Sequence, residues 1–284
     1  MTTTTISNSN LSAQIKHVGA EVFSLKSDLN KEYIWEGNPT FWGKHSPILF
    51  PIVGSLKHNS YSYNSKQFKL NRHGFAREMA FELIEKTAES ATFSLASTIE
   101  TKKIYPFDFE LQISYSLEDN KLNINYKVIN NNDLTMPFAI GAHPAFALPG
   151  DFENYSLEFQ KDEILNYHLL ENGLISNSTN NLPLNNRRLE LKYNLFEKDA
   201  LVFKTLKSKS ITILKNANPV LRVNFSDFPN LGIWTVVNAP FLCIEPWFGY
   251  SDTLHEHVEF TKKEGIQLLE KQKTFKSNYS IEIL

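Results

Sequence analysis

The sequence predicts an all-β protein, a large antiparallel β-sandwich with few short helices. Short runs of alternating apolar and polar residues recur along the 284-residue chain. Turn residues separate these runs at roughly ten-residue intervals, as in sandwiches and barrels. The chain contains 21 Phe, 11 Tyr and 4 Trp, and aromatic residues favour strands. No long stretch has the 3.6-residue apolar period of an amphipathic helix.

Two pairs of segments have the pattern of antiparallel hairpins. Residues 81–85 and 91–95 alternate in polarity on either side of a short polar link. Residues 111–117 and 122–128 do the same, with a cleaner alternation. Strands that pack one face on a core and expose the other show this pattern. We therefore expect both pairs to form neighbouring strands.

The chain length suits one large β domain, and we expect a single domain over residues 1–284. Residues 1–12 are polar and predict a flexible N-terminal lead. Residues 172–194 are polar and rich in turn formers, which predicts a long loop. Residues 265–269 and 279–283 predict a closing pair of strands.

Composition excludes several classes of protein. The net charge of −2 gives no basic surface for nucleic acid or an anionic membrane. The N-terminus lacks the features of a signal peptide, and no apolar run is long enough to span a bilayer. The lone Cys243 excludes an internal disulfide and a cysteine metal cluster. We expect a cytoplasmic protein without nucleic-acid or membrane partners.

The stretch 240–247, PFLCIEPW, holds a carboxylate in an apolar run. Read as a strand, it presents on one face Phe241, Cys243, Glu245 and Trp247. Burial would raise the pKa of Glu245 unless a cation or hydrogen-bond donor offset it. A carboxylate of this kind is either functional or a structural group tied to an arginine or backbone N–H groups. Cys243 reads as a small buried apolar residue rather than a nucleophile.

The segment 71–77, NRHGFAR, is a second candidate. If it is extended, one face carries His73, Phe75 and Arg77. That arrangement would place an imidazole, an aromatic ring and a guanidinium together. The alternative is that the His and the Arg pair with surface acids.

The segment 136–146, MPFAIGAHPAF, is the third. If it is extended, one face carries Pro137, Ala139, Gly141 and His143. The small residues leave a hollow beside the imidazole, which indicates a functional role for His143. The alternative is a hydrogen-bonded core histidine.

Together these segments offer an acid–base pair. Histidine titrates near neutrality, and a carboxylate with a shifted pKa can act as a base. There is no nucleophile elbow. His73, His143 and Glu245 could form a His2Glu metal site, but they include no local ligand pair, and we expect no metal. The segment 255–257, HEH, has polar neighbours that favour a solvated loop.

Four motifs, in order, resemble the aldose 1-epimerase (galactose mutarotase-like) family. They are RHGFAR (72–77), MPF with GAHPAF (136–146), FPNLGIWT (228–235) and CIEPW (243–247). The resemblance runs from about residue 13 to the C-terminus and is closest to the LacX-like branch. It implies the galactose mutarotase-like supersandwich, with the site in a cleft on one sheet.

The resemblance also implies roles for individual residues. His143 would be the general acid and Glu245 the general base, with His73 and Arg77 contacting the sugar. Trp234, in the third motif, is a further candidate for substrate binding. The family also uses an Asp that holds sugar hydroxyls; it has no clear match, and Asp227 is the candidate.

The function implied is interconversion of the α and β anomers of an aldose by acid–base ring opening. This reaction requires neither cofactor nor metal, since it already proceeds in water. Alternatives are a hexose-6-phosphate 1-epimerase, a non-catalytic sugar sensor, or a lyase or hydrolase of similar fold. A hydrolase would need two carboxylates, and the motifs offer one. Arg77 as the single basic residue of its segment's face predicts a preference for unphosphorylated aldoses.

Overall fold

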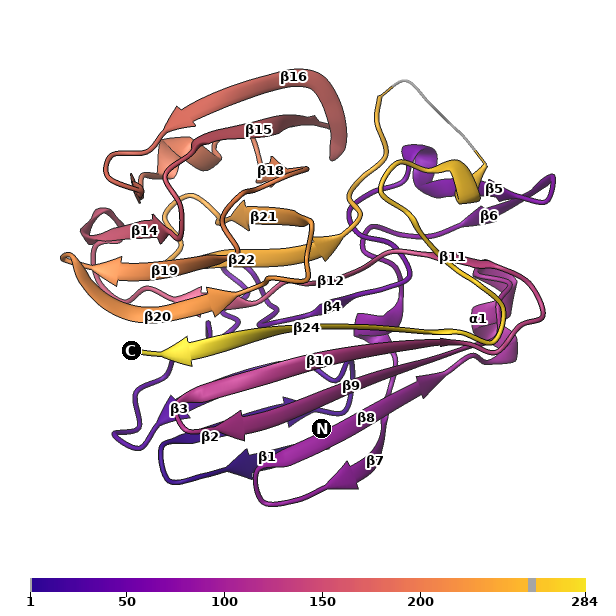
Figure 1. The fold of residues 1–284 in the computed structure, drawn as a ribbon, viewed down its shortest axis with the longest axis horizontal. Coiled ribbons are helices and arrows are strands. Elements are labelled where there is room, and N and C mark those ends of the chain that lie inside the picture. Colours follow the sequence, from indigo (N-terminus) through magenta and orange to yellow (C-terminus); the bar gives the residue numbers. More distant parts are fainter. Residues whose placement is uncertain (1, 255–258) are drawn as a thin grey trace.

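The computed structural model describes residues 2–254 and 259–284 and confirms the all-β prediction (Figure 1). Its strands form antiparallel sheets. Helical structure is limited to short pieces, which are α1 (Ile99–Ile104) and the 3-10 helices η1 (Lys57–Asn59), η2 (Ala76–Glu78), η3 (Phe152–Asn154), η4 (Tyr193–Phe196) and η5 (Phe260–Lys262). Within the described residues, no helix has the length and apolar character needed to cross a membrane.

The largest sheet has nine strands. In spatial order they are β17 (Arg188–Glu190), β14 (Tyr155–Phe159), β19 (Ser210–Lys215), β20 (Asn218–Asn224), β24 (Thr274–Ile283), β10 (Lys121–Asn130), β9 (Phe109–Glu118), β8 (Ser90–Ala96) and β7 (Glu82–Lys86). Both predicted hairpins are present as β7–β8 and β9–β10. In β9 and β10 every second residue is buried, as the alternation in the sequence predicts.

The second large sheet carries the candidate site. Its path is β16 (Leu174–Pro183), β15 (Ile164–Glu171), β18 (Leu201–Phe203), β21 (Asn230–Trp234), β22 (Phe241–Phe248), β12 (Ile140–Ala142) and β4 (Ile48–Leu49), with β13 (Ala145–Ala147) also paired to β22. β22 is buried along almost its whole length, in agreement with its apolar sequence.

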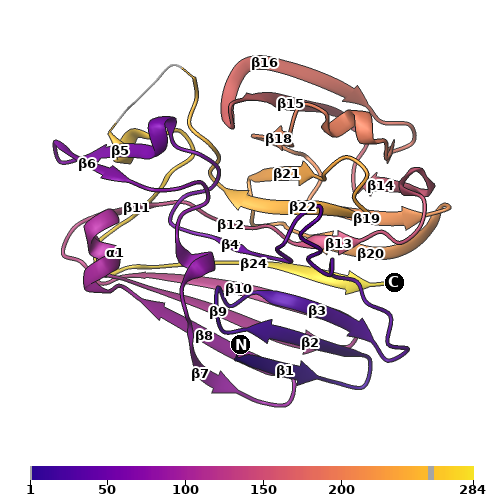
Figure 2. The same ribbon diagram turned by 180° about the vertical axis from the view of Figure 1, so that it is seen from behind.

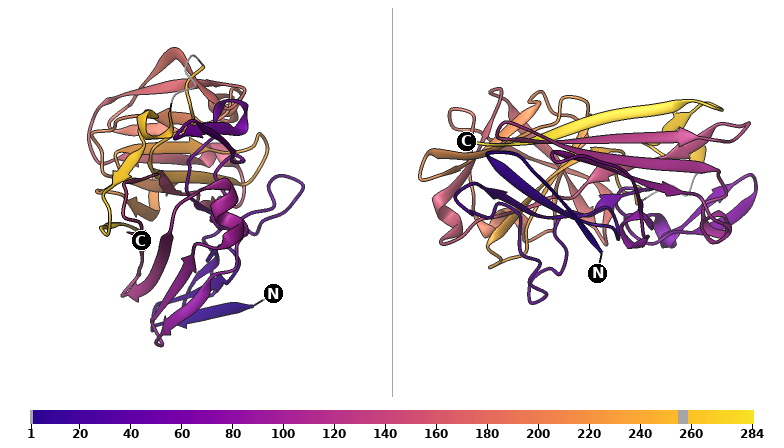
Figure 3. Two further views of the ribbon diagram at one scale, coloured as in Figure 1. Left: turned by 90° about the vertical axis from the view of Figure 1, so that its right-hand side faces the viewer. Right: turned by 90° about the horizontal axis from the view of Figure 1, so that it is seen from below.

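Smaller sheets complete the fold. They are β1 (Thr3–Ser7), β2 (Leu11–Lys16) and β3 (Val22–Ser27); β5 (Ser60–Tyr63) and β6 (Lys66–Lys69); and β11 (Met136–Phe138) with β23 (Gln267–Leu269). The β1–β3 sheet lies across the strands β8 and β9 (Figure 2). Figure 3 shows this N-terminal sheet, in indigo, at the opposite end of the molecule from β15 and β16.

One large apolar core joins the two main sheets. It combines side chains of β9 and β10, such as Ile113 and Ile124, with Leu242 and Ile244 of β22. Because strand side chains alternate, the other face of β22 points away from this core. That other face carries Glu245.

Three predictions about segments are wrong. Residues 3–7 form β1, paired with β2 along its whole length, so residues 1–12 are not a flexible lead. Residues 174–183 and 188–190 are strands β16 and β17, so residues 172–194 are not a long loop. β23 and β24 do not pair with each other; β23 pairs with β11, and β24 with β10 and β20. The segment 255–257 lies outside the described residues.

Candidate active site

His143 and Glu245 meet because of the register between their strands. Gly141 of β12 is opposite Trp247 of β22, and Ala145 of β13 is opposite Cys243. The same register, continued between these pairs, places His143 opposite Glu245. Directly opposed residues of an antiparallel pair have their side chains on the same face. The two side chains accordingly approach to 3.3 Å between His143 Nε2 and Glu245 Oε2.

The residues that lie opposite Glu245 on the next two strands of the sheet are small or apolar. Glu245 is opposite Gly232 of β21, which in turn is opposite Val202 of β18. Gly232 is required there because a Cβ would lie 2.3 Å from the Trp247 indole. Gly141 has a similar role, since its Cβ would lie 2.5 Å from the same ring. The space over Gly141, part of the hollow predicted beside His143, is therefore filled by the Trp247 indole.

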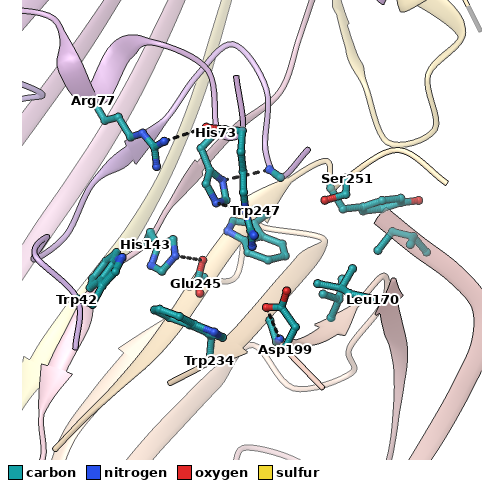
Figure 4. Close-up of a pocket in the computed structure, with 16 residues that line it drawn as sticks. Trp42, His73, Arg77, His143, Leu170, Asp199, Trp234, Glu245, Trp247 and Ser251 are labelled. Atoms are coloured by element: carbon teal, nitrogen blue, oxygen red, sulfur yellow. Dashed lines mark hydrogen bonds and ion pairs between the residues drawn. The ribbon is translucent and has the colours of Figure 1, made fainter. Parts of the chain in front are cut away.

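Aromatic rings surround the His143 imidazole. Trp42 stacks on it with ring centroids 4.7 Å apart, and Trp234 meets it edge-on at 5.6 Å. The His73 ring is also edge-on, at 5.6 Å. His143 Nδ1 is buried and makes no hydrogen bond to the described residues. Only Nε2 is directed at a partner, which is the Glu245 carboxylate (Figure 4).

His73 reaches the site from a tight turn rather than from a strand. His73 and Gly74 both have positive φ values, of 69° and 71°, and a Cβ on Gly74 would lie 2.2 Å from the Phe50 carbonyl oxygen. The turn sends the Phe75 ring into the core and leads Arg77 into η2. The prediction that His73, Phe75 and Arg77 share one face of an extended strand is therefore wrong, because the backbone forms a turn here.

The turn also brings in Arg72, which sequence reasoning passed over. In an extended strand Arg72 would lie on the face opposite His73. In the structure its Nε lies 3.2 Å from His73 Nε2, and the Arg77 guanidinium donates to the Arg72 carbonyl oxygen at 2.9 Å. The guanidinium groups of Arg72 and Arg77 therefore lie beside the His73 imidazole, and all three side chains line the cavity.

These groups line a cavity of about 550 Å3, a size typical of small-molecule sites. Of the residues predicted from sequence, it includes His73, Arg77, His143, Trp234 and Glu245. It also includes polar and aromatic residues that were not predicted, which are Trp42, Arg72, Asp199, Trp247, Tyr250 and Ser251. Its aliphatic wall consists of Leu170, Ile175, Ala200 and Val202.

The predicted Asp227 does not lie in this cavity. Its carboxylate accepts hydrogen bonds from the backbone and side-chain N–H groups of Asn278 at 2.9 Å, on the nine-stranded sheet. The acid in the cavity is Asp199, just before β18, whose carboxylate also accepts a bond from Ala200 N at 2.8 Å. The Asp–Phe–Pro–Asn run made Asp227 conspicuous in sequence, whereas Asp199 stands in an ordinary polar stretch.

Burial controls the protonation of the central pair. Burial raises the pKa of Glu245 well above 4.5. The positive charge of Arg72 and the nearby Trp247 indole N–H lower this pKa, and the negative charge of Asp199 raises it further. The Trp247 N–H makes no hydrogen bond of normal geometry to the described residues. Burial also lowers the pKa of His143 to about 3, helped by the positive charge of Arg72. These shifts favour a protonated Glu245 beside a neutral His143, a pair that holds one proton.

The site also offers donor atoms for a metal. One ligand atom each of His143, Cys243 and Glu245 lies within 4.8 Å of the others, and these are ligand types that zinc accepts. His73, a member of the His2Glu set that the sequence could in principle offer, is not in this group. Burial raises the pKa of the Cys243 thiol well above 9, with a further contribution from Glu245, which opposes formation of the thiolate ligand.

Comparisons with known proteins identify the family of this chain. The family model described as Aldose 1-epimerase matches residues 2–267. Protein LacX of Lactococcus lactis is 36% identical, with 98% of both chains covered.

Two solved structures share the fold closely. A galactose mutarotase related enzyme from Lactobacillus acidophilus has a TM-score of 0.95 at 34% identity, covering 100% of this chain and 97% of its own. A galactose mutarotase-like protein from Lactobacillus casei has a TM-score of 0.93 at 30% identity, with 100% of both chains covered. The chain belongs to the aldose 1-epimerase family.

Proposed function

We propose that the protein interconverts the α and β anomers of an aldose, with His143 and Glu245 as the acid–base pair. Membership of the family supports a sugar epimerase role. The observation that carries the proposal is the 3.3 Å approach of His143 Nε2 to Glu245 Oε2 within a cavity large enough for a sugar. Both groups can then reach adjacent atoms of one ring, as proton transfer requires.

Ring opening begins with the shared proton on His143 and the Glu245 side chain as carboxylate. The positive charge of Arg72 favours this carboxylate. Glu245 takes the proton of the C1 hydroxyl while the C1–O5 bond breaks and His143 protonates O5. The products are the open-chain aldehyde, a protonated Glu245 and a neutral His143, which is the state that burial favours.

Ring closure uses the same groups in the opposite sense. Rotation about the C1–C2 bond presents the other face of the aldehyde to the O5 hydroxyl. His143 removes the O5 proton as O5 attacks C1, and Glu245 protonates the carbonyl oxygen. The proton count of the pair is restored at the end of each cycle. Each positioned group can contribute on the order of 10² to 10⁴ in rate.

The neighbouring side chains would bind the sugar. His73 and Arg77 lie on one side of the pair and Asp199 on the other (Figure 4). Asp199, rather than Asp227, is therefore our candidate for the family's hydroxyl-binding acid. Trp234 offers an aromatic surface to the apolar C–H groups of the ring.

A hexose-6-phosphate 1-epimerase is the second candidate, and Arg72 is the observation that favours it. The sequence argument for a neutral sugar rested on Arg77 being the only basic group on its face. In the structure both arginines line the cavity. The nearest carboxylate to Arg77 Nε is that of Glu78 at 3.7 Å, and its side chain is 64% exposed. Two guanidinium groups could hold a phosphate.

The test is anomer exchange followed by NMR over free aldoses and their 6-phosphates. We expect acceleration over buffer, with free aldoses preferred. A kcat/KM ratio that strongly favours the phosphate, and that collapses in both Arg72→Ala and Arg77→Ala, would establish the second candidate. Sugar binding without any acceleration would leave a sensor and remove the epimerase.

A further inference from the structure

The His73 ring is held in place by the backbone of Gly54. The Gly54 N–H donates to His73 Nδ1 at 3.1 Å, and the His73 N–H donates back to the Gly54 carbonyl at 2.8 Å. Burial lowers the pKa of His73 well below 6.5, so the ring is neutral. A neutral imidazole has one N–H, and an accepting Nδ1 places it on Nε2. The Arg72 Nε–H also points at Nε2, from 3.2 Å, and would donate to it in the other tautomer. A neutral ring can accept at only one nitrogen, and we assign acceptance to Nδ1 because the Gly54 bond is shorter and is paired with the return bond from the His73 N–H.

The backbone of Gly54 is fixed in turn by Ser251 and Asp252. A Cβ on Gly54 would lie 2.1 Å from Ser251 Oγ, so the two residues are in tight contact. The Ser55 N–H donates to Ser251 Oγ at 2.9 Å, and the Asp252 N–H to the Ser55 carbonyl at 2.8 Å. The Lys57 N–H donates to Asp252 Oδ2 at 2.9 Å. The position of residues 54–57 therefore depends on that of residues 251–252.

A buried lysine, Lys263, holds residues 251–252 in place. Lys263 Nζ lies 3.2 Å from Asp252 Oδ1 and donates to the Tyr250 carbonyl at 2.6 Å, with side-chain exposures of 4% for Lys263 and 12% for Asp252. Ile175, from the aliphatic wall of the cavity, donates its N–H to the Asp252 carbonyl at 2.8 Å. Asp252 therefore links the aliphatic wall of the cavity, through Ile175, to residues 54–57, which contact His73.

A buried ion pair of this kind is poor evidence for stability alone. The desolvation of two charges offsets most of their attraction, and apolar replacements are often as stable. A fixed orientation of the Asp252 carboxylate is a more specific consequence. With Oδ1 on Lys263, Oδ2 is directed at the Lys57 N–H.

We propose that the Lys263–Asp252 ion pair positions the His73 ring, with Nδ1 accepting from the Gly54 N–H, by fixing residues 251–252 and through them Gly54. Lys263 and Asp252 are thus positioning residues for sugar binding. The kinetic part of this inference rests on the proposed function, whereas the effect on the His73 ring does not.

The test is the double variant Lys263→Met/Asp252→Asn, which removes both charges and keeps most of the shape. In the parent, 15N NMR of the histidine rings should show His73 with Nδ1 unprotonated and Nε2 protonated. In the double variant we expect a mixture of tautomers for His73. We also expect kcat/KM to fall on the order of 10- to 100-fold, since small misplacements of substrate-contacting groups have large effects.

A matched control is Arg222→Gln/Glu282→Gln, which removes an ion pair of 3.1 Å on the nine-stranded sheet. It should leave both the His73 signals and kcat/KM unchanged. Unchanged His73 ring signals in the folded Lys263/Asp252 variant would overturn the proposal, whatever the kinetics.

A milder variant decides the matter if the double variant does not fold. Ser251→Ala removes the acceptor of the Ser55 N–H and leaves the ion pair in place. The proposal predicts the same change in the His73 ring signals, and their constancy would overturn it. Because this readout needs no substrate, failure of the epimerase proposal would not be mistaken for failure of this one.

Discussion

Burial of Glu245 and His143 determines how many protons the pair holds. Both side chains are almost inaccessible, and burial disfavours the charged form of each. Their pKa values move in opposite directions, upward for Glu245 and downward for His143 to about 3. A single proton therefore stays with the pair over a wide pH range.

We predict that kcat/KM has no inflection near pH 6.5, where an ordinary histidine would titrate. Activity should fall in acid only as the pair takes up a second proton, near pH 3, and in base only as the pair loses its proton above the raised pKa of Glu245. The measurement is a pH–rate profile of anomer exchange, corrected for buffer catalysis. A tenfold loss per pH unit below about 6.5 would show that a normal histidine controls the reaction.

The residues of the site differ in how well the sequence could locate them. His143 and Glu245 each stand in a nearly continuous apolar strand, where a polar side chain is conspicuous. Arg72 and Asp199 do not, because their placement depends on a turn and a loop. Strand alternation placed Arg72 on the wrong face, since it cannot anticipate two successive positive φ values at His73 and Gly74.

At the scale of elements, β22 organises the site. Its inner residues complete the core, and its outer residues present Cys243, Glu245 and Trp247 to the other side. The two short strands β12 and β13 pair with it on either side of His143. Sequence predicted these apolar runs, but their register depends on hydrogen bonds between segments a hundred residues apart.

We predict that Gly232→Ala displaces the Trp247 indole and weakens sugar binding. The added Cβ would lie 2.3 Å from the ring, and overpacking of this kind costs about 1–3 kcal/mol. Sugar affinity by calorimetry and the free energy of unfolding should both fall. Gly43→Ala is the control, because its Cβ would meet Pro39 at an ordinary 3.7 Å. Equal affinity and stability in Gly232→Ala and the parent would contradict this packing.

At the scale of the whole molecule, Glu21 ties the N-terminal sheet to the loop before β4. It pairs with Lys16 of β2 at 3.1 Å and accepts the N–H groups of His45 and Ser46 at 2.8 and 3.0 Å. Burial alone would raise the pKa of Glu21, but these partners lower it to about 2. Residues 1–12 are ordered in turn by the pairing of β1 with β2 and by contacts of β1 with β8 and β9. A local reading of this polar segment cannot anticipate those contacts and therefore predicted a flexible lead.

We predict that Glu21→Gln lowers the free energy of unfolding at pH 7 by about 1–3 kcal/mol. The pKa of Glu21 in the folded protein, about 2, lies below the ordinary value of 4.5, so its contribution to stability is present above pH 4.5 and is lost as pH falls towards 2. Urea unfolding should therefore show a difference between parent and variant that shrinks over this range. Glu158→Gln, in a surface pair with Arg187, should cost less than about 1 kcal/mol. A pH-independent difference would refute the linkage to Glu21.

The most direct test of the account is anomer exchange by Glu245→Gln, measured together with sugar binding. The amide keeps the shape of the side chain and can hydrogen-bond, but it cannot accept the C1 hydroxyl proton at neutral pH. We predict that the exchange rate falls on the order of 10²- to 10⁴-fold while the dissociation constant for the sugar changes little. An exchange rate equal to that of the parent would remove Glu245 from the mechanism and contradict the account.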